Sequence, residues 1–174
     1  MIWFIMSEVL FFAVFFGALF YARQLSIPWL SGEGVKIFNG LLLWPEFDAA
    51  WPTNGPGVVG GHADGTFETI PAFGLPAWNT AILLTSGVTI TIAHHALRAG
   101  NRTLLNIFLA ATWILGFIFV FLQAEEYMHA YHELNLTLGS GVYGSTFFML
   151  TGFHGLHVTI GAIMLLVIWL RVMK

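Results

Sequence analysis

Four long uninterrupted apolar stretches constrain this 174-residue chain more than any other feature. They cover about residues 1–22, 75–97, 104–124 and 142–170. A helix needs about 20 mainly apolar residues to cross the hydrocarbon core of a bilayer, whereas barrel strands are shorter and alternate apolar with polar residues. Charged residues make up only 9% of the chain, too few for a soluble domain of this apolar content. The sequence therefore predicts an all-α integral membrane bundle with four transmembrane helices.

The cysteine count and the net charge exclude several classes of function. The chain has no cysteine, which excludes disulfides, thiolate zinc sites, iron–sulfur clusters and a catalytic cysteine. A net charge of −3 gives no reason to expect a nucleic-acid partner. Residues 23–74 form the one substantial extramembrane loop, rich in glycine and proline, and we expect turns rather than regular structure there. We predict one membrane domain over residues 1–174.

Basic residues near the span ends predict the orientation. Arg98, Arg102, Arg171 and Lys174 fall on one side of the membrane. The other side has Arg23 and Lys36, diluted by the acidic residues Glu33, Glu46, Asp48, Asp64 and Glu68. Because Lys and Arg gather on the cytoplasmic side, both chain ends are predicted to face the cytoplasm or the mitochondrial matrix.

Glu8 is the one carboxylate inside an apolar stretch. A charge near the middle of a bilayer costs from about 3 to more than 10 kcal/mol, depending on how it is assessed, so such a residue needs an explanation. One interpretation is a neutral carboxylic acid that is hydrogen-bonded to a neighbouring helix. The other is a carboxyl group that touches a proton route or a lipid head group. Both depend on a neighbouring chain, because no basic residue accompanies Glu8 within its own span.

Histidines and glutamates at helical spacing raise the question of a metal site. His154 and His157 share one helix face and could bind a metal or form interhelical hydrogen bonds. His94 and His95 are neighbours and point about 100° apart, so they cannot share one ligand face. Glu126 and His129 form one Glu-x-x-His step, whereas di-iron carboxylate proteins use two. Spacing alone therefore reveals no self-sufficient metal or catalytic centre.

Four blocks, in order along the chain, resemble subunit III of the cytochrome c oxidases. The blocks are Ser7-Glu8-Val9; Leu83-Leu84-Thr85-Ser86-Gly87 with Ala93-His94-His95-Ala96-Leu97; Gln123-Ala124-Glu125-Glu126-Tyr127; and Val142-Tyr143-Gly144-Ser145-Thr146-Phe147-Phe148 with Thr151-Gly152-Phe153-His154-Gly155-Leu156-His157-Val158. The paired histidines and the full Tyr-Gly-Ser-Thr-Phe-Phe run favour the cytochrome c branch over the quinol oxidases.

The resemblance implies a seven-span, non-catalytic accessory subunit that binds no haem or copper itself. Such a subunit packs with subunits I and II, which hold those cofactors, and meets cytochrome c only indirectly. It binds phospholipid and supports proton uptake and sustained turnover in a bacterial or mitochondrial inner membrane.

The resemblance also assigns residues. Glu8 matches a buried carboxylate, Arg171 an arginine that meets a lipid phosphate, and Tyr127 a tyrosine near the lipid cleft. A structural role is implied for the other polar motif residues, which are His94, His95, His154, His157, Glu125 and Glu126.

The chain departs from the family pattern in three respects. The match covers the family's third to sixth helices, so we expect a fragment, one piece of a split subunit or a shortened variant. Gly17 stands where the family often has tryptophan, and loop 23–74 is longer than in mitochondrial members.

Two alternative functions stay open. One is a membrane metalloenzyme or haem-binding anchor that uses His154, His157 and the Glu126–His129 pair. The other is a subunit III-like partner of a quinol oxidase or a nitric-oxide reductase.

Overall fold

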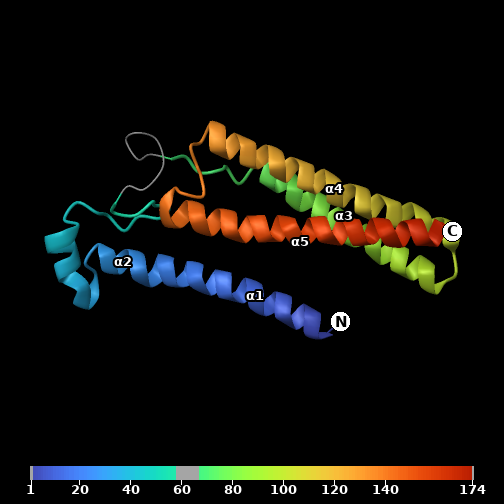
Figure 1. Cartoon of the computed structure of the whole chain (residues 1–174), viewed down its shortest axis with the longest axis horizontal. Coiled ribbons are helices and arrows are strands. Elements are labelled where there is room, and N and C mark those ends of the chain that lie inside the picture. The colour runs from blue at the N-terminus through green and yellow to red at the C-terminus, as the bar shows by residue number, and fades with distance from the viewer. Residues whose placement is uncertain (1, 58–66, 174) are drawn as a thin grey trace. The chain divides into compact units, whose positions relative to one another are not determined.

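The computed structural model describes residues 2–57 and 67–173, and this part of the chain is helical and contains no strand (Figure 1). Four helical stretches are long and apolar enough to cross a membrane: Ile2–Leu30, Leu75–Arg98, Arg102–His132 and Gly141–Met173. The prediction of an all-α protein with four candidate transmembrane helices is therefore confirmed. Three residues used above, Met1, Asp64 and Lys174, lie outside the described residues.

The first stretch is helical beyond the predicted span. Helix α1 (Ile2–Tyr21) continues through a π-helical turn, η1 (Ala22–Ser26), into α2 (Ile27–Leu30). Pro28 has no N–H to donate to the carbonyl four residues earlier, which accounts for a widened turn just before it. The helix thus passes the predicted boundary at residue 22 and carries Arg23 beyond the apolar segment.

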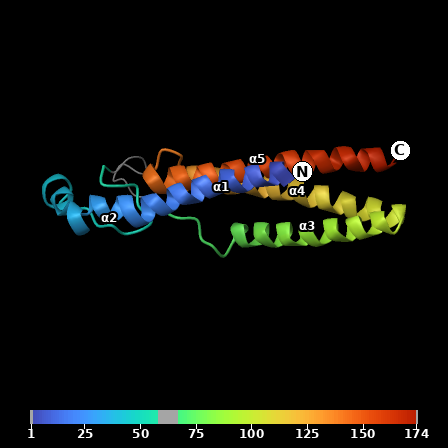
Figure 2. The ribbon, with the colours of Figure 1, turned by 90° about the horizontal axis from the view of Figure 1, so that it is seen from below.

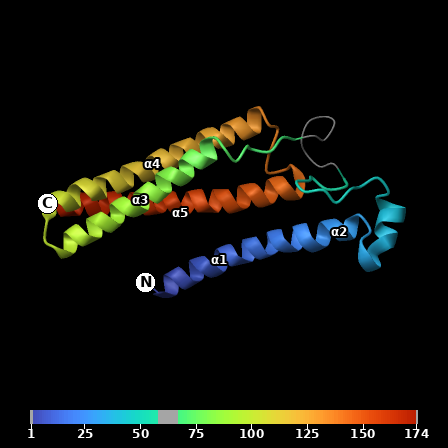
Figure 3. The same cartoon turned by 180° about the vertical axis from the view of Figure 1, so that it is seen from behind.

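The long loop contains more helix than the sequence led us to expect. Two short pieces, η2 (Gly34–Lys36) and η3 (Asn39–Leu43), follow α2. Figures 1 and 3 show this segment, coloured cyan, running across the end of α2. The Asn39 side-chain amide donates a hydrogen bond to the carbonyl of Trp29 (3.3 Å), which ties the segment to α2.

The chain divides into two compact units, each of which is described by itself. Unit 1 comprises residues 1–69 and 130–152, and unit 2 comprises residues 70–129 and 153–174. In unit 1 the loop packs on the start of α5 (Gly141–Met173), where the Tyr143 amide donates to the Thr53 carbonyl at 3.3 Å. Gly141 has φ +69°, and a Cβ there would overlap the carbonyl of Asn54. The single-domain prediction stays a prediction.

Unit 2 is built on a tight helical hairpin of α3 (Leu75–Arg98) and α4 (Arg102–His132), shown in Figures 1 and 2. Gly100, at φ +72°, ends α3, because its N–H donates to Leu97 O and the N–H of Asn101 donates to Ala96 O. The Asn101 side chain then caps α4 by accepting a hydrogen bond from the Leu104 amide at 3.1 Å. One short turn therefore stops one helix and starts the next.

Small residues, one polar pair and a tryptophan hold the three helices of unit 2 together. The buried core consists of Ala93, Ala96, Leu105 and Leu109. The hydroxyls of Thr89 on α3 and Thr112 on α4 are hydrogen-bonded at 2.9 Å. The Trp169 indole N–H of α5 donates to the Asn106 carbonyl of α4 at 3.1 Å. Because lipid offers no competing hydrogen bonds, these few polar contacts fix the helix register.

Gly116 on α4 lies against Ala162 on α5, and this contact can be tested. A Cβ on Gly116 would lie 3.1 Å from the Cβ of Ala162, whereas a Cβ on Gly161 meets nothing within 4 Å. We predict that Gly116→Leu destabilises the protein by about 1–3 kcal/mol through overpacking, and that Gly161→Leu is nearly neutral. Thermal unfolding in detergent measures both variants. Equal midpoints for the two would contradict the α4–α5 contact.

Candidate functional site

The candidate residue Arg171 lies in a pocket at the turn of the α3–α4 hairpin. The pocket, here called the hairpin pocket, has a volume of about 450 Å³. Its lining combines the end of α3, the turn, the start of α4 and the last turn of α5: Ala96, Leu97, Gly100, Asn101, Arg102, Leu105, Arg171 and Val172. Apolar side chains thus form much of the wall, and two guanidinium groups add positive charge.

The two arginines of the hairpin pocket, Arg102 and Arg171, have no carboxylate partner among the described residues. Within residues 2–57 and 67–173, neither Arg102 nor Arg171 takes part in an ion pair, and both side chains are exposed. Two cations that share one pocket repel each other, so an anion between them would be stabilised by both. A guanidinium presents a planar fork of donors that matches a phosphate or carboxylate in bidentate geometry. The chemistry of the pocket therefore suits an anionic group.

His94 and His95 lie on the last turns of α3, next to this pocket in sequence. Both side chains are exposed, and their ring centroids are 6.1 Å apart in a T-shaped arrangement. The backbone carbonyl of His95 accepts the hydrogen bond of the Ala99 amide, which closes the helix.

His154 and His157 contact helices rather than a ligand set. The His157 ring donates from Nδ1 to the carbonyl of Phe153, one turn earlier, at 2.6 Å. Because a carbonyl only accepts, this bond places a proton on Nδ1. The His154 ring meets the Phe119 ring of α4 edge-on, with centroids 5.8 Å apart. The His157 bond lies within α5, and the His154 ring contact joins α5 to α4; the assigned roles of both residues stay predictions.

The end of α4 carries the polar block with Tyr127. Glu126 is buried, at 6% exposed, whereas Glu125 is exposed and Tyr127 is half-buried. In the part of the chain that the structure describes, no group of three or more His, Asp or Glu side chains could hold a metal ion.

Glu8 lies on α1 in unit 1 and is partly exposed among exposed apolar side chains. Its neighbours Ile5 and Val9 are 57% and 59% exposed. The carboxyl group thus lies on a mostly apolar surface, next to the exposed Ser7. Its assignment as a lipid-contacting or proton-linked group stays a prediction.

Sequence reasoning missed an aromatic cluster in unit 1. The Tyr143 ring lies 5.6 Å from the Trp51 ring and 5.5 Å from the Phe67 ring, measured between centroids, so two loop residues pack on the start of α5. The Arg23 guanidinium lies 5.8 Å from the centroid of the same Trp51 ring, a cation–π distance.

A second pocket adjoins this cluster and is here called the loop-side pocket. It has a volume of about 160 Å³ and is lined by Leu19, Arg23, Trp51, Tyr143, Thr146, Phe147, Leu150 and Thr151. The signal that could have revealed it is an arginine just past an apolar span, together with tryptophan in the loop that follows.

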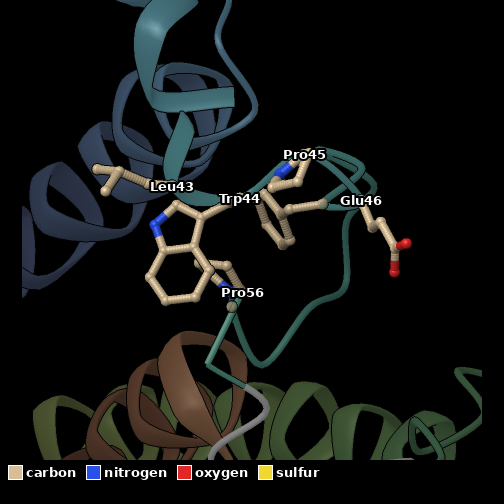
Figure 4. Close-up of a pocket in the computed structure, with 7 residues that line it drawn as sticks. Leu43, Trp44, Pro45, Glu46 and Pro56 are labelled. Atoms are coloured by element: carbon tan, nitrogen blue, oxygen red, sulfur yellow. The ribbon is translucent and has the colours of Figure 1, made fainter. Parts of the chain in front are cut away.

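A third hollow, of about 420 Å³, lies within the loop itself and is shown in Figure 4. Trp44, Pro45 and Pro56 line it, while the Glu46 side chain points away from Trp44 and Pro56. Most of its lining residues are apolar, and Glu46 is the charged residue among them.

Comparison with known proteins gives consistent matches. A family model described as "Cytochrome c oxidase subunit III" matches residues 33–174. The chain is 42% identical over 171 residues to cytochrome c oxidase subunit 3 of Oryctolagus cuniculus, covering 98% of this chain and 53% of that protein. It is 41% identical over 174 residues to the Dugong dugon protein of that name and 42% identical over 174 residues to that of Struthio camelus. In each of these two cases the match covers 100% of this chain and 54% of the relative. The chain thus spans about half the length of the curated relatives it matches.

Proposed function

Because this chain belongs to the cytochrome c oxidase subunit III family and is a multi-pass membrane protein, we propose that it acts as a non-catalytic accessory subunit of a proton-pumping cytochrome c oxidase. The family match over residues 33–174 is the observation that carries the proposal. The partners would be subunits I and II, which would hold the haem and copper, and cytochrome c would be met indirectly. The membrane would be a bacterial or mitochondrial inner membrane, with both chain ends on the cytoplasmic or matrix side.

The proposal includes phospholipid binding at the hairpin pocket. Arg171 is the residue that the family resemblance assigns to a lipid phosphate, and Arg102 lines the same pocket from the start of α4. Anionic lipids of the cytoplasmic leaflet attract Lys and Arg near the surface by about 1 kcal/mol for each residue. Apolar residues such as Leu97 and Leu105 add a wall for the upper part of an acyl chain. The pocket thus combines a charged head-group site with an apolar one.

Glu8 and Tyr127 complete the proposed lipid-contacting and proton-linked set. Glu8 lies on an exposed apolar surface of α1, where a carboxyl group can accept or donate a hydrogen bond to a lipid head group. The proposal also includes support of proton uptake by the catalytic partner, and Glu8 is the residue proposed for that role.

Purification from native membranes tests the central proposal. The tagged full chain should bring down partner chains that contain haem and copper, detectable by an optical spectrum and by metal analysis. A chain recovered alone but carrying its own haem or metal would instead support the metalloenzyme alternative. A chain recovered with a quinol oxidase or a nitric-oxide reductase would contradict the cytochrome c branch.

We predict that Arg102→Gln and Arg171→Gln each lower the amount of phospholipid retained by the purified protein. Loss of a charge-assisted hydrogen bond to phosphate is worth about 1.5–3 kcal/mol, so retention should fall about tenfold or more. Quantitative lipid mass spectrometry after detergent washing measures it. Arg98→Gln is the matched control, because Arg98 ends the same hairpin helix without lining the pocket. Equal retention in all three variants would contradict a phosphate site here.

We predict that Glu8→Gln leaves assembly intact and changes lipid retention or the time for which the oxidase sustains turnover. The amide keeps the shape of the side chain but cannot ionise or give up a proton. Turnover-dependent inactivation, followed as oxygen consumption over time, is the readout. Glu33→Gln, an exposed carboxylate beyond the end of α2, serves as control. If Glu8→Gln matched the wild type in lipid content and in lifetime, only a structural role would remain.

A further inference from the structure

The loop-side pocket is lined by a cation, Arg23, for which residues 2–57 and 67–173 supply no anionic partner. Arg23 follows α1 in the π-helical turn and forms no ion pair within the described residues. Its guanidinium is positioned over the Trp51 ring, which itself packs on Tyr143. Arg23 thus contacts a loop residue that packs on the start of α5, and no carboxylate of the described residues neutralises it.

Arg23 lies at the end of the apolar stretch of α1. It is the first charged residue after Glu8, and Gln24 follows it, so this turn marks the boundary of the apolar region. Tryptophan and tyrosine are enriched at this level, and both line the pocket. Leu19 lies one turn below Arg23 on the same helix face, and Leu150 lies two turns after Tyr143 on α5. The pocket therefore extends from the head-group level into the apolar region.

The polar groups of the pocket require a ligand that accepts hydrogen bonds. The hydroxyls of Thr146 and Thr151 donate to carbonyls of their own helix, Val142 O at 2.6 Å and Phe147 O at 2.7 Å. Among the lining side chains, Arg23 is the only cation. A group that fits must therefore bring negative charge near Arg23 and apolar atoms near Leu19 and Leu150.

We propose that the loop-side pocket binds the phosphate of a glycerophospholipid in the leaflet on the side of loop 23–74. A volume of about 160 Å³ is about five times the ~30 Å³ that a water molecule occupies in the liquid. That volume suits a phosphate with its glycerol carbons, while the acyl chains continue outside along the apolar surfaces of α1 and α5. The site is separate from the hairpin pocket and does not require the proposed oxidase function.

The test counts phospholipids on the full chain purified from native membranes with whatever co-purifies. Arg23→Gln should lower retention of one phospholipid per chain about tenfold under detergent washing, because a charge-assisted contact to phosphate is lost. Arg23→Lys should lower it less, since the ammonium keeps the charge but lacks the bidentate fork. Lys36→Gln is the matched control, because Lys36 is the other cation of the described loop and does not line the pocket.

Three outcomes would overturn the inference. The first is that Arg23→Gln retains as much phospholipid as the wild type. If Arg171→Gln lost phospholipid in the same assay, the separate proposal for the hairpin pocket would still stand. Faster tryptic cleavage after Lys36 in Arg23→Gln, without lipid loss, would show that Arg23 serves only to hold Trp51. Delipidated protein that regains inorganic phosphate but not phosphatidylglycerol, measured as native mass adducts, would identify a free anion as the occupant.

Discussion

The absence of hydrogen-bonding solvent in a bilayer is the constraint from which the rest of this structure follows. Backbone groups must be satisfied within helices, and the side-chain hydroxyls follow the same rule. Thr85, Thr91 and Thr159 each donate to the carbonyl four residues earlier on their own helix, at 2.8 Å. Few polar groups are then available between helices, so the helices of unit 2 depend on Thr89–Thr112, on Trp169–Asn106 and on the close approach at Gly116.

The sequence predicted the helices well where it contains stop signals. The predicted span 75–97 differs by one residue from α3, because Gly100 can adopt the left-handed conformation that ends a helix. The predicted span 104–124 is shorter than α4, which continues to His132. Most of residues 125–132 are polar, but polar residues do not by themselves end a helix, and the chain turns only near Asn135, at φ +51°. Hydropathy thus indicates where a helix can leave the lipid, whereas backbone conformation decides where it ends.

The candidate sites were only partly predictable, for a different reason. Arg171 was found through its motif position, but nothing in the local sequence pairs it with Arg102, because the pocket forms only when α5 meets the α3–α4 turn. Arg23 similarly acquires its surroundings from Trp51 and Tyr143, which lie far along the chain. A family motif therefore identifies individual residues, whereas tertiary packing decides which other side chains lie beside them and what they can bind. The helical pieces η2 and η3 were missed because glycine and proline dominated the interpretation of the loop.

The distribution of arginine links the scarcity of charge to the proposed lipid role. The chain has four arginines, and three of them, Arg23, Arg102 and Arg171, line the two pockets, while Arg98 lines neither. Any cation at a bilayer surface attracts lipid phosphates weakly and without a preferred orientation. A guanidinium beside an apolar wall makes that attraction depend on orientation. The phosphate must meet the guanidinium while the acyl chain lies against the wall. In such a charge-poor chain, we expect this geometry, more than the number of cations, to decide which lipids stay bound.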